Sequence, residues 1–357
     1  MSLSIGIVGL PNVGKSTLFN ALTKNSILAA NYPFATIEPN TGIVPVPDER
    51  LAVLQKMYSA EKVIPATVTF VDIAGLVAGA SKGEGLGNKF LANIRDCDAI
   101  VHVVRAFHDD DVTHVSEKVD PRADIDVITT ELILADIQTL EGHLPKVQRE
   151  AKSDPKVKTK LTYLEQLLSS LNEGIVPDQI DTEILQGLPL LTAKPVIYLF
   201  NVDETTLTDD VKKAELSQFV APANTVFVCA KLEEELKDLA EDEARELLES
   251  YGVTESGLRQ LARSAYDTLG LQSYLTAGPK EVRAWTIKKG STAPQAAGVI
   301  HTDFEKGFIA ASIVDYDDLI ATGSETAAKS AGKLRTEGRD YIMRPGDIVE
   351  FRFNVSK

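Results

Sequence analysis

Residues 9–17 read Gly-Leu-Pro-Asn-Val-Gly-Lys-Ser-Thr, and this stretch decides the fold. It follows an apolar run at residues 3–8 and leads into residues 15–22, whose apolar side chains have helical spacing. A glycine-bounded loop between a strand and a helix is the setting that a phosphate-binding loop requires. Successive backbone N–H groups then converge on the β-phosphate, and the helix N-terminus adds its partial positive charge. The stretch therefore predicts a nucleoside triphosphate site.

Two side chains of this loop have distinct expected roles. Lys15 can reach the β- and γ-phosphates as a point charge, and the Ser16 hydroxyl is placed to bind Mg²⁺. The remaining contacts come from backbone N–H groups. We expect the phosphates to be bound by Asn12, Val13, Gly14, Lys15, Ser16 and Thr17.

Length and composition indicate a multidomain globular protein. A chain of 357 residues exceeds one small core and predicts two or three domains, and 44% apolar with 25% charged residues is ordinary for this class. Neither a membrane-spanning stretch nor a signal region is apparent, so we expect a cytoplasmic protein with no membrane partner. The two cysteines, Cys97 and Cys229, lack the spacing of a zinc site, and we expect Cys97 to be a small buried residue.

The net charge of −15 argues against binding nucleic acid over the whole surface, and no DNA partner is predicted. Two local basic patches stand out, and either one alone is more typical of a solvated face. The first comprises Lys146, Arg149, Lys152, Lys156, Lys158 and Lys160, and the second comprises Lys329, Lys333, Arg335, Arg339 and Arg344.

Buried strands and helices alternate through the first two thirds of the chain. This alternation predicts an α/β fold with a mostly parallel sheet covered on both faces. The strands are expected at residues 5–8, 66–73, 99–104, 195–200 and 225–228.

A helical insertion is expected between the third and fourth strands, at about residues 125–190. Apolar residues recur three and four apart from 125 to 171, and Asp154-Pro155 interrupts the pattern. Two antiparallel helices forming a hairpin are therefore predicted, with a basic tip around residues 149–160.

The chain becomes acidic and helical at residues 232–269, and Gly278-Pro279 then marks a plausible boundary. We therefore expect a nucleotide-binding domain at residues 1–277 and a small α+β domain at residues 278–357. The second domain should hold a helix at about 292–299 and strands at 282–287, 308–314, 341–343 and 348–353.

Two further elements suggest a switch-type site. Asp72 ends a predicted strand in the stretch Asp-Ile-Ala-Gly, so its carboxylate can act near Mg²⁺ and the Gly75 N–H can meet the γ-phosphate. Thr36 lies between the phosphate loop and Asp72, where a second hydroxyl ligand for Mg²⁺ is expected. The expected catalytic residues are Lys15, Asp72 and Gly75, and the expected metal ligands are Ser16 and Thr36.

In the order of these motifs the chain resembles the Obg-related group of translation-factor-type GTP-binding proteins, most closely its YchF branch. The resemblance covers nearly the full length. Residues 285–290 and 301–308 make the last domain similar to the TGS module, a ubiquitin-like β-grasp fold. The resemblance implies a ribosome-associated ATPase whose bound nucleotide sets its affinity for its partner, with ribosomal RNA contacting the basic patches.

The loop expected to read the base departs from the pattern of GTP-binding relatives. They carry Asn-Lys-x-Asp, whose carboxylate accepts hydrogen bonds from guanine, whereas residues 201–204 read Asn-Val-Asp-Glu. Asn201 can pair with adenine N6 and N7, while Glu204 is expected to point elsewhere. Losing a charge-assisted bond to guanine removes a preference of roughly tenfold or more, which favours ATP. We expect base contacts from Asn201, Val202, Glu204, Ala230 and Lys231.

Hydrolysis should be slow without a partner. Many GTPases have a water-orienting glutamine where this chain has Leu76, and leucine cannot hold water by hydrogen bonding. His102 and His114 are candidates to replace that glutamine, although each is more typical of a packing or surface histidine.

Two alternatives stay open. Glu204 can stand in for the aspartate of a GTPase with the same fold. Alternatively, the chain can be a non-catalytic module that binds RNA or the ribosome under nucleotide control. Leu76 favours that module, whereas Lys15, Ser16, Thr36 and Asp72 together favour catalysis.

Overall fold

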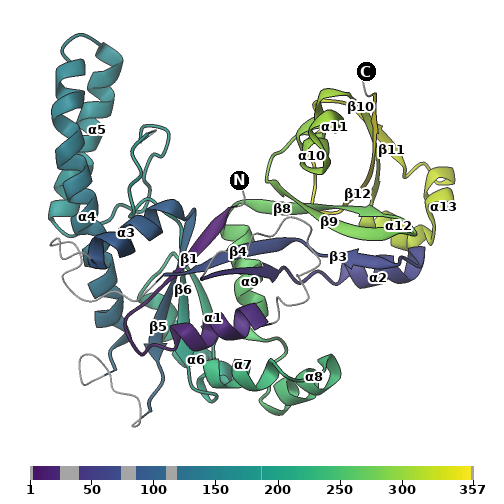
Figure 1. Ribbon diagram of the computed structural model, residues 1–357, viewed down its shortest axis with the longest axis horizontal. Coiled ribbons are helices and arrows are strands. Elements are labelled where there is room, and N and C mark those ends of the chain that lie inside the picture. The colour runs from purple at the N-terminus through teal and green to yellow at the C-terminus, as the bar shows by residue number, and fades with distance from the viewer. Residues whose placement is uncertain (1–2, 25–39, 74–85, 110–118, 186, 355–357) are drawn as a thin grey trace. The chain divides into compact units, whose positions relative to one another are not determined.

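The computed structural model describes residues 3–24, 40–73, 86–109, 119–185 and 187–354 (Figure 1). These residues form two compact units. The first comprises Met1–Gly42 and Thr69–Leu261, and the second comprises Ile43–Val68 and Ala262–Lys357. The second unit therefore takes its residues from two separate parts of the sequence.

The first sheet has the strand order β2-β4-β1-β5-β6-β7. The pairings of β1 with β4 and β5, of β5 with β6, and of β6 with β7 are all parallel. All five predicted strands are present, which confirms the α/β prediction, and β2 is an additional strand. The bounds are β1 Ser4–Val8, β2 Thr41–Pro45, β4 Thr67–Asp72, β5 Ala99–Ala106, β6 Val196–Val202 and β7 Asn224–Val228.

Helices connect most of these strands, as βαβ crossovers between parallel neighbours require. The helices are α1 Lys15–Lys24, α3 Leu86–Asp96, α4 Pro121–Glu150, α5 Pro155–Asn172, α6 Asp210–Gln218, α7 Ala230–Leu236, α8 Glu241–Ser250 and α9 Gly257–Thr268, with a 3₁₀ turn, η3, at Thr206–Thr208.

Helices α4 and α5 form the predicted antiparallel hairpin, drawn side by side in Figure 1. Asp154 ends the connection between them by accepting a hydrogen bond from Lys156 N at 2.9 Å, with Pro155 in the first turn of α5. Leucines on the facing sides, such as Leu140 and Leu164, are fully buried. Asp136 of α4 binds the returning chain by accepting three hydrogen bonds, of 2.7–2.8 Å, from Leu191 and Thr192.

The second unit is built on a mixed sheet with the strand order β11-β10-β12-β8-β9-β3. Helix α10 packs on it through a core that includes Tyr274, Ala297 and Ile313. Residues 341–343, predicted as a strand, form only an isolated bridge between Ile342 and Thr292. The elements are α2 Arg50–Tyr58, β3 Lys62–Ile64, β8 Leu271–Ala277, β9 Glu281–Lys288, α10 Ala293–Ile300, α11 Thr302–Lys306, β10 Phe308–Asp315, α12 Tyr316–Thr322, α13 Glu325–Ser330, β11 Arg335–Glu337 and β12 Asp347–Phe353.

The boundary expected near residue 278 differs from the division of the structure into units. The second unit begins at Ala262 and also takes in residues 43–68, which we call the arm. Within it, β3 pairs in parallel with β9, and Glu61 N donates to Pro279 O at 3.1 Å. The Tyr58 hydroxyl donates to Glu325 at 2.6 Å. The local pattern of the arm could not reveal a pairing with residues more than 200 positions away.

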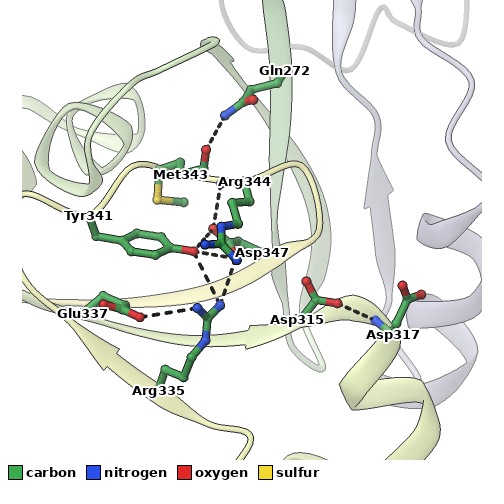
Figure 2. Close-up of polar contacts among 9 residues, drawn as sticks. All are labelled: Gln272, Asp315, Asp317, Arg335, Glu337, Tyr341, Met343, Arg344 and Asp347. Atoms are coloured by element: carbon green, nitrogen blue, oxygen red, sulfur yellow. Dashed lines mark hydrogen bonds and ion pairs between the residues drawn. The ribbon is translucent and has the colours of Figure 1, made fainter.

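A polar network around Asp347 closes the turn before β12 (Figure 2). The carboxylate is fully buried and accepts hydrogen bonds from Arg344 N at 2.8 Å and from the Tyr341 hydroxyl at 2.9 Å. The guanidinium nitrogens of Arg335 lie 3.4 Å from Asp347 Oδ1 and 3.4 Å from Glu337 Oε1. Burial raises the pKa of Asp347, and the bonds from Arg344 and Tyr341 partly offset that effect. Arg335, a member of the second basic patch, is therefore neutralised within the fold.

Candidate nucleotide-binding site

The predicted phosphate loop joins β1 to α1 in the expected way. Gly14 has φ +89°, and a Cβ there would lie 2.4 Å from Asn201 Nδ2, so only glycine fits. Asn12 also has a positive φ of 63°, which asparagine tolerates better than most residues. Leu18 N donates to Gly14 O at 3.0 Å, which starts the helix immediately after the loop. The backbone therefore has the strand, loop and helix geometry of a phosphate-binding site.

The structure brings Lys15 and Asp72 together in a direct ion pair. Asp72 ends β4, and its N–H donates to Asn40 O at 2.8 Å. Ser16, in the first turn of α1, is exposed. A hydroxyl and a carboxylate beside a phosphate loop are oxygen ligands of the kind that Mg²⁺ prefers, so these residues fit that ion. Thr36, Gly75 and Leu76 lie outside the described residues.

Asn201 links two loops of the site. Its side chain is only 3% exposed. Nδ2 donates to Val13 O in the phosphate loop at 2.9 Å, and Oδ1 accepts from Ala230 N at 3.0 Å. The sequence pattern predicts a base contact for Asn201 but gives no sign of this link. The amide keeps one hydrogen and one lone pair for such a contact.

Glu204 and Lys231 form an ion pair of 3.0 Å between the two loops expected to flank the base. The hydrogen bond lowers the pKa of Glu204 and raises the pKa of Lys231. The carboxylate is thus engaged by a cation of this chain. The Val202 side chain packs in the core with Phe200 and Val220, so only its backbone is available to a nucleotide.

His102 is a packing residue. It is buried in β5, with its ring centroid 5.4 Å from that of Tyr198, and burial lowers the pKa of His102 to about 3. Its Nε2 atom has no hydrogen-bond partner among the described residues. His114 lies outside the described part of the chain. Cys97 is a free, buried residue, as expected.

One buried cation near the site was missed. Arg105 is paired in register with Asn201 and is 1% exposed. Its guanidinium donates to Asp109 O at 3.2 Å and lies 4.4 Å from the centroid of the Phe107 ring. It thereby orders the chain that follows β5. In the sequence, Arg105 could have been recognised as a single arginine at the end of an otherwise apolar strand.

In the part of the chain that the structure describes, no cluster of three or more histidine, cysteine, aspartate or glutamate side chains could bind a metal ion. No described helix has both the length and the apolar character needed to cross a membrane.

Comparison with known proteins identifies the family. A protein named "Ribosome-binding ATPase YchF" from Haemophilus ducreyi is 52% identical, with 99% of this chain and 100% of that protein covered. The chain belongs to the YchF family. The Bacillus subtilis YchF protein is 49% identical over the same shares of the two chains. The YchF GTPase structure from Schizosaccharomyces pombe matches with a TM-score of 0.87, at 40% identity and 98% coverage of both chains.

Two family models match separate parts of this chain. MMR_HSR1, described as "50S ribosome-binding GTPase", matches residues 4–139. YchF-GTPase_C, described as "Protein of unknown function (DUF933)", matches residues 271–354. These matches confirm the resemblance and the P-loop fold. The arm falls inside the first match, although its contacts place it in the second unit.

Proposed function

We propose that this protein is a cytoplasmic, ribosome-associated ATPase whose bound nucleotide sets its affinity for the ribosome. The observation that carries the catalytic part is the phosphate loop with Lys15 beside Asp72. The ribosomal part is supported by relatives of about 50% identity that are named ribosome-binding ATPases. We also assign residues 278–357 to the TGS class.

In the proposed reaction, water attacks the γ-phosphorus in line with its bond to the β–γ bridging oxygen; that bond breaks, ADP leaves, and inorganic phosphate and a proton are released. The backbone N–H groups of residues 12–17 bind the phosphate oxygens, and Lys15 stabilises the charge that develops on them. Gly75 N–H is assigned to the γ-phosphate, and Asp72 orients Lys15 through their ion pair. Mg²⁺, when held by Ser16 and Thr36, would add electrostatic stabilisation of the phosphates.

We expect the protein to bind ATP at least tenfold more tightly than GTP. Glu204 is paired with Lys231, so guanine N1–H and its amino group lack a free carboxylate acceptor at that position. Titration calorimetry with each nucleotide and Mg²⁺ measures the ratio. Equal affinities, or tighter binding of GTP, would support the alternative that the protein is a GTPase.

The hairpin tip is the better of the two basic patches for binding RNA. Lys146, Arg149, Lys152, Lys156 and Lys158 are all exposed. Among the described residues, none of these five forms an ion pair with a carboxylate. Their charges are therefore available to phosphates.

Much of the second patch is used within the fold. Arg335 pairs with Asp347 and Glu337, as Figure 2 shows. Lys333 forms an ion pair of 3.0 Å with Asp318, and the Arg339 guanidinium donates to the Phe308 carbonyl. This difference supports the proposal that the hairpin tip contacts the ribosome.

Replacing Lys152, Lys156 and Lys158 together with alanine should weaken co-sedimentation with ribosomal subunits. If all three contact phosphates, the slope of log affinity against log salt should fall by about 2 to 3. ATP hydrolysis without ribosomes should not change, because the tip is remote in sequence from every predicted site residue.

A matched control removes the same charge from lysines that already have partners. Lys212, Lys237 and Lys289 pair with aspartate or glutamate side chains in the structure. Their triple alanine variant should bind ribosomes like the wild type. An equal loss in both triple variants would show that net charge, rather than the hairpin tip, determines binding.

A further inference from the structure

Helix α7 connects several parts of the nucleotide site. Its first residue, Ala230, donates its N–H to Asn201, and Lys231 pairs with Glu204. The helix also packs against α1, the helix that follows the phosphate loop. The position of α7 therefore determines where residues 229–231 lie. These residues form the junction of β7 and α7, and we call them the base-flanking loop.

Glu233, one turn into α7, has a buried carboxylate that is 5% exposed. Oε1 accepts a hydrogen bond from Leu258 N at 3.3 Å, and the Gly257 N–H and the Ser256 side chain also favour the ionised carboxylate by lowering its pKa. These residues form the N-terminus of α9. The first N–H groups of a helix have no partner within it, and an acceptor there is further favoured by the helix dipole. Glu233 thus caps a helix that begins 24 residues after it in the sequence.

The same end of α9 lies against the strand that precedes the base-flanking loop. A Cβ built on Gly257 would lie 2.6 Å from Phe227 O and 2.7 Å from Val228 Cγ2. Glycine is needed for this approach, because a side chain would collide with the backbone of β7. Helix α9 therefore contacts both sides of the loop, β7 on one side and α7 on the other.

A cavity of about 90 Å³ lies behind the loop and borders Cys229, Leu232 and Glu233. This part of the site is therefore not supported by close packing alone. Loss of the Glu233 contact would give α7 room to shift toward the cavity, and the base-flanking loop would shift with it.

We propose that Glu233 is a positioning residue for the nucleotide base, because its bonds to the N-terminus of α9 hold residues 229–231 in place. This inference rests on the proposed function, in which Ala230 and Lys231 flank the base. Glu233 is assigned no contact with the nucleotide and acts through the loop. The phosphate loop is held mainly by β1 and α1, so loss of Glu233 should affect it much less than residues 229–231, although Asn201 links it to Ala230.

The required property of Glu233 is hydrogen bonding rather than charge. Burial raises the pKa of Glu233 to about 7, although the bonds from Leu258 and Gly257 favour the ionised form. A glutamine has nearly the same shape and retains an oxygen acceptor for the α9 N–H groups. Glu233→Gln should therefore preserve the contact, whereas Glu233→Ala removes it.

The test compares two probes on the full-length protein, Mg²⁺ with ATP and Mg²⁺ with inorganic tripolyphosphate, by titration calorimetry. Glu233→Ala should weaken ATP binding about tenfold and leave tripolyphosphate binding within about twofold. Glu233→Gln should match the wild type for both probes. If the alanine variant does not fold, Glu233→Asp, which shortens the side chain by one methylene, should show a smaller loss confined to ATP.

Three results would overturn the inference: an equal loss for both probes, no loss for ATP, or a loss in Glu233→Gln as large as in Glu233→Ala. The first would identify a purely structural cap. Failure of the proposed function looks different. Wild-type protein that binds tripolyphosphate as tightly as ATP would show that no base contact exists, independently of every Glu233 variant.

Discussion

Replacing Lys15 with alanine should lower the rate of ATP hydrolysis by about 10² to 10³ and should strongly weaken ATP binding. The ammonium group is the one side-chain cation that the phosphate loop itself directs at the β- and γ-phosphates. The variant leaves Asp72 without its ion-pair partner beside the phosphates, so a bound nucleotide would also meet an uncompensated negative charge. Both effects act against the triphosphate.

Single-turnover hydrolysis and calorimetry measure the two parts of this prediction. Lys212→Ala is a suitable control, because that lysine is exposed and pairs with Asp209 away from the loop. It should behave like the wild type. Lys15→Ala protein that hydrolyses ATP as fast as the wild type would place the catalytic centre elsewhere or reveal a contaminating enzyme.

The same comparison separates catalysis from nucleotide-gated binding. A non-catalytic module would bind ATP through Lys15 but show no turnover that depends on it, even with ribosomes present. Because Leu76 replaces a water-orienting glutamine, we expect the wild-type rate without a partner to be slow, so the measurement should be repeated with ribosomal subunits. A Lys15-dependent rate under either condition identifies an ATPase.

The phosphate loop and the parallel strands were predictable because their signals are local. Residues 9–17 contain the whole motif, and β5 is an apolar run of the kind found in strands buried on both faces. The hairpin was equally visible, because Asp154-Pro155 interrupts one helical period and caps the next helix. In each case, the residues that determine the structure are adjacent in the sequence.

The parts that were missed depend on residues far apart in the sequence. Asn201 was understood as a base-reading residue, but its bonds to Val13 and Ala230 exist only once three strands are aligned. In the sequence, Glu233 is one of three consecutive glutamates that are expected on the solvent-exposed face of a helix. Its contact with α9 is visible only in the folded structure. Strand β3 is only three residues long, and its partner β9 lies near the other end of the chain. The spacing of apolar residues within a segment does not identify partners that are distant in the sequence.

A substitution in the arm should also have a large effect, in this case on stability. Leu54→Ala should lower the free energy of unfolding of the second unit by about 2–5 kcal/mol, the range for removing a fully buried leucine side chain. Leu54 is 0% exposed, and its helix, α2, packs against β8 and β9. Position in the sequence alone would place Leu54 in the nucleotide-binding domain, where its loss should leave the C-terminal sheet intact.

Trp285 makes this distinction measurable, because it is the only tryptophan of the chain and packs against the core of the second unit. In denaturant titrations, the fluorescence midpoint of Leu54→Ala should fall well below that of the wild type. Val53→Ala, a neighbour that is 41% exposed, should stay within about 0.5 kcal/mol.

An unchanged Trp285 transition in Leu54→Ala, together with weakened ATP binding, would mean that the arm is stabilised by the first unit. A shifted transition would show that a segment between Thr36 and Asp72 belongs energetically to the C-terminal sheet.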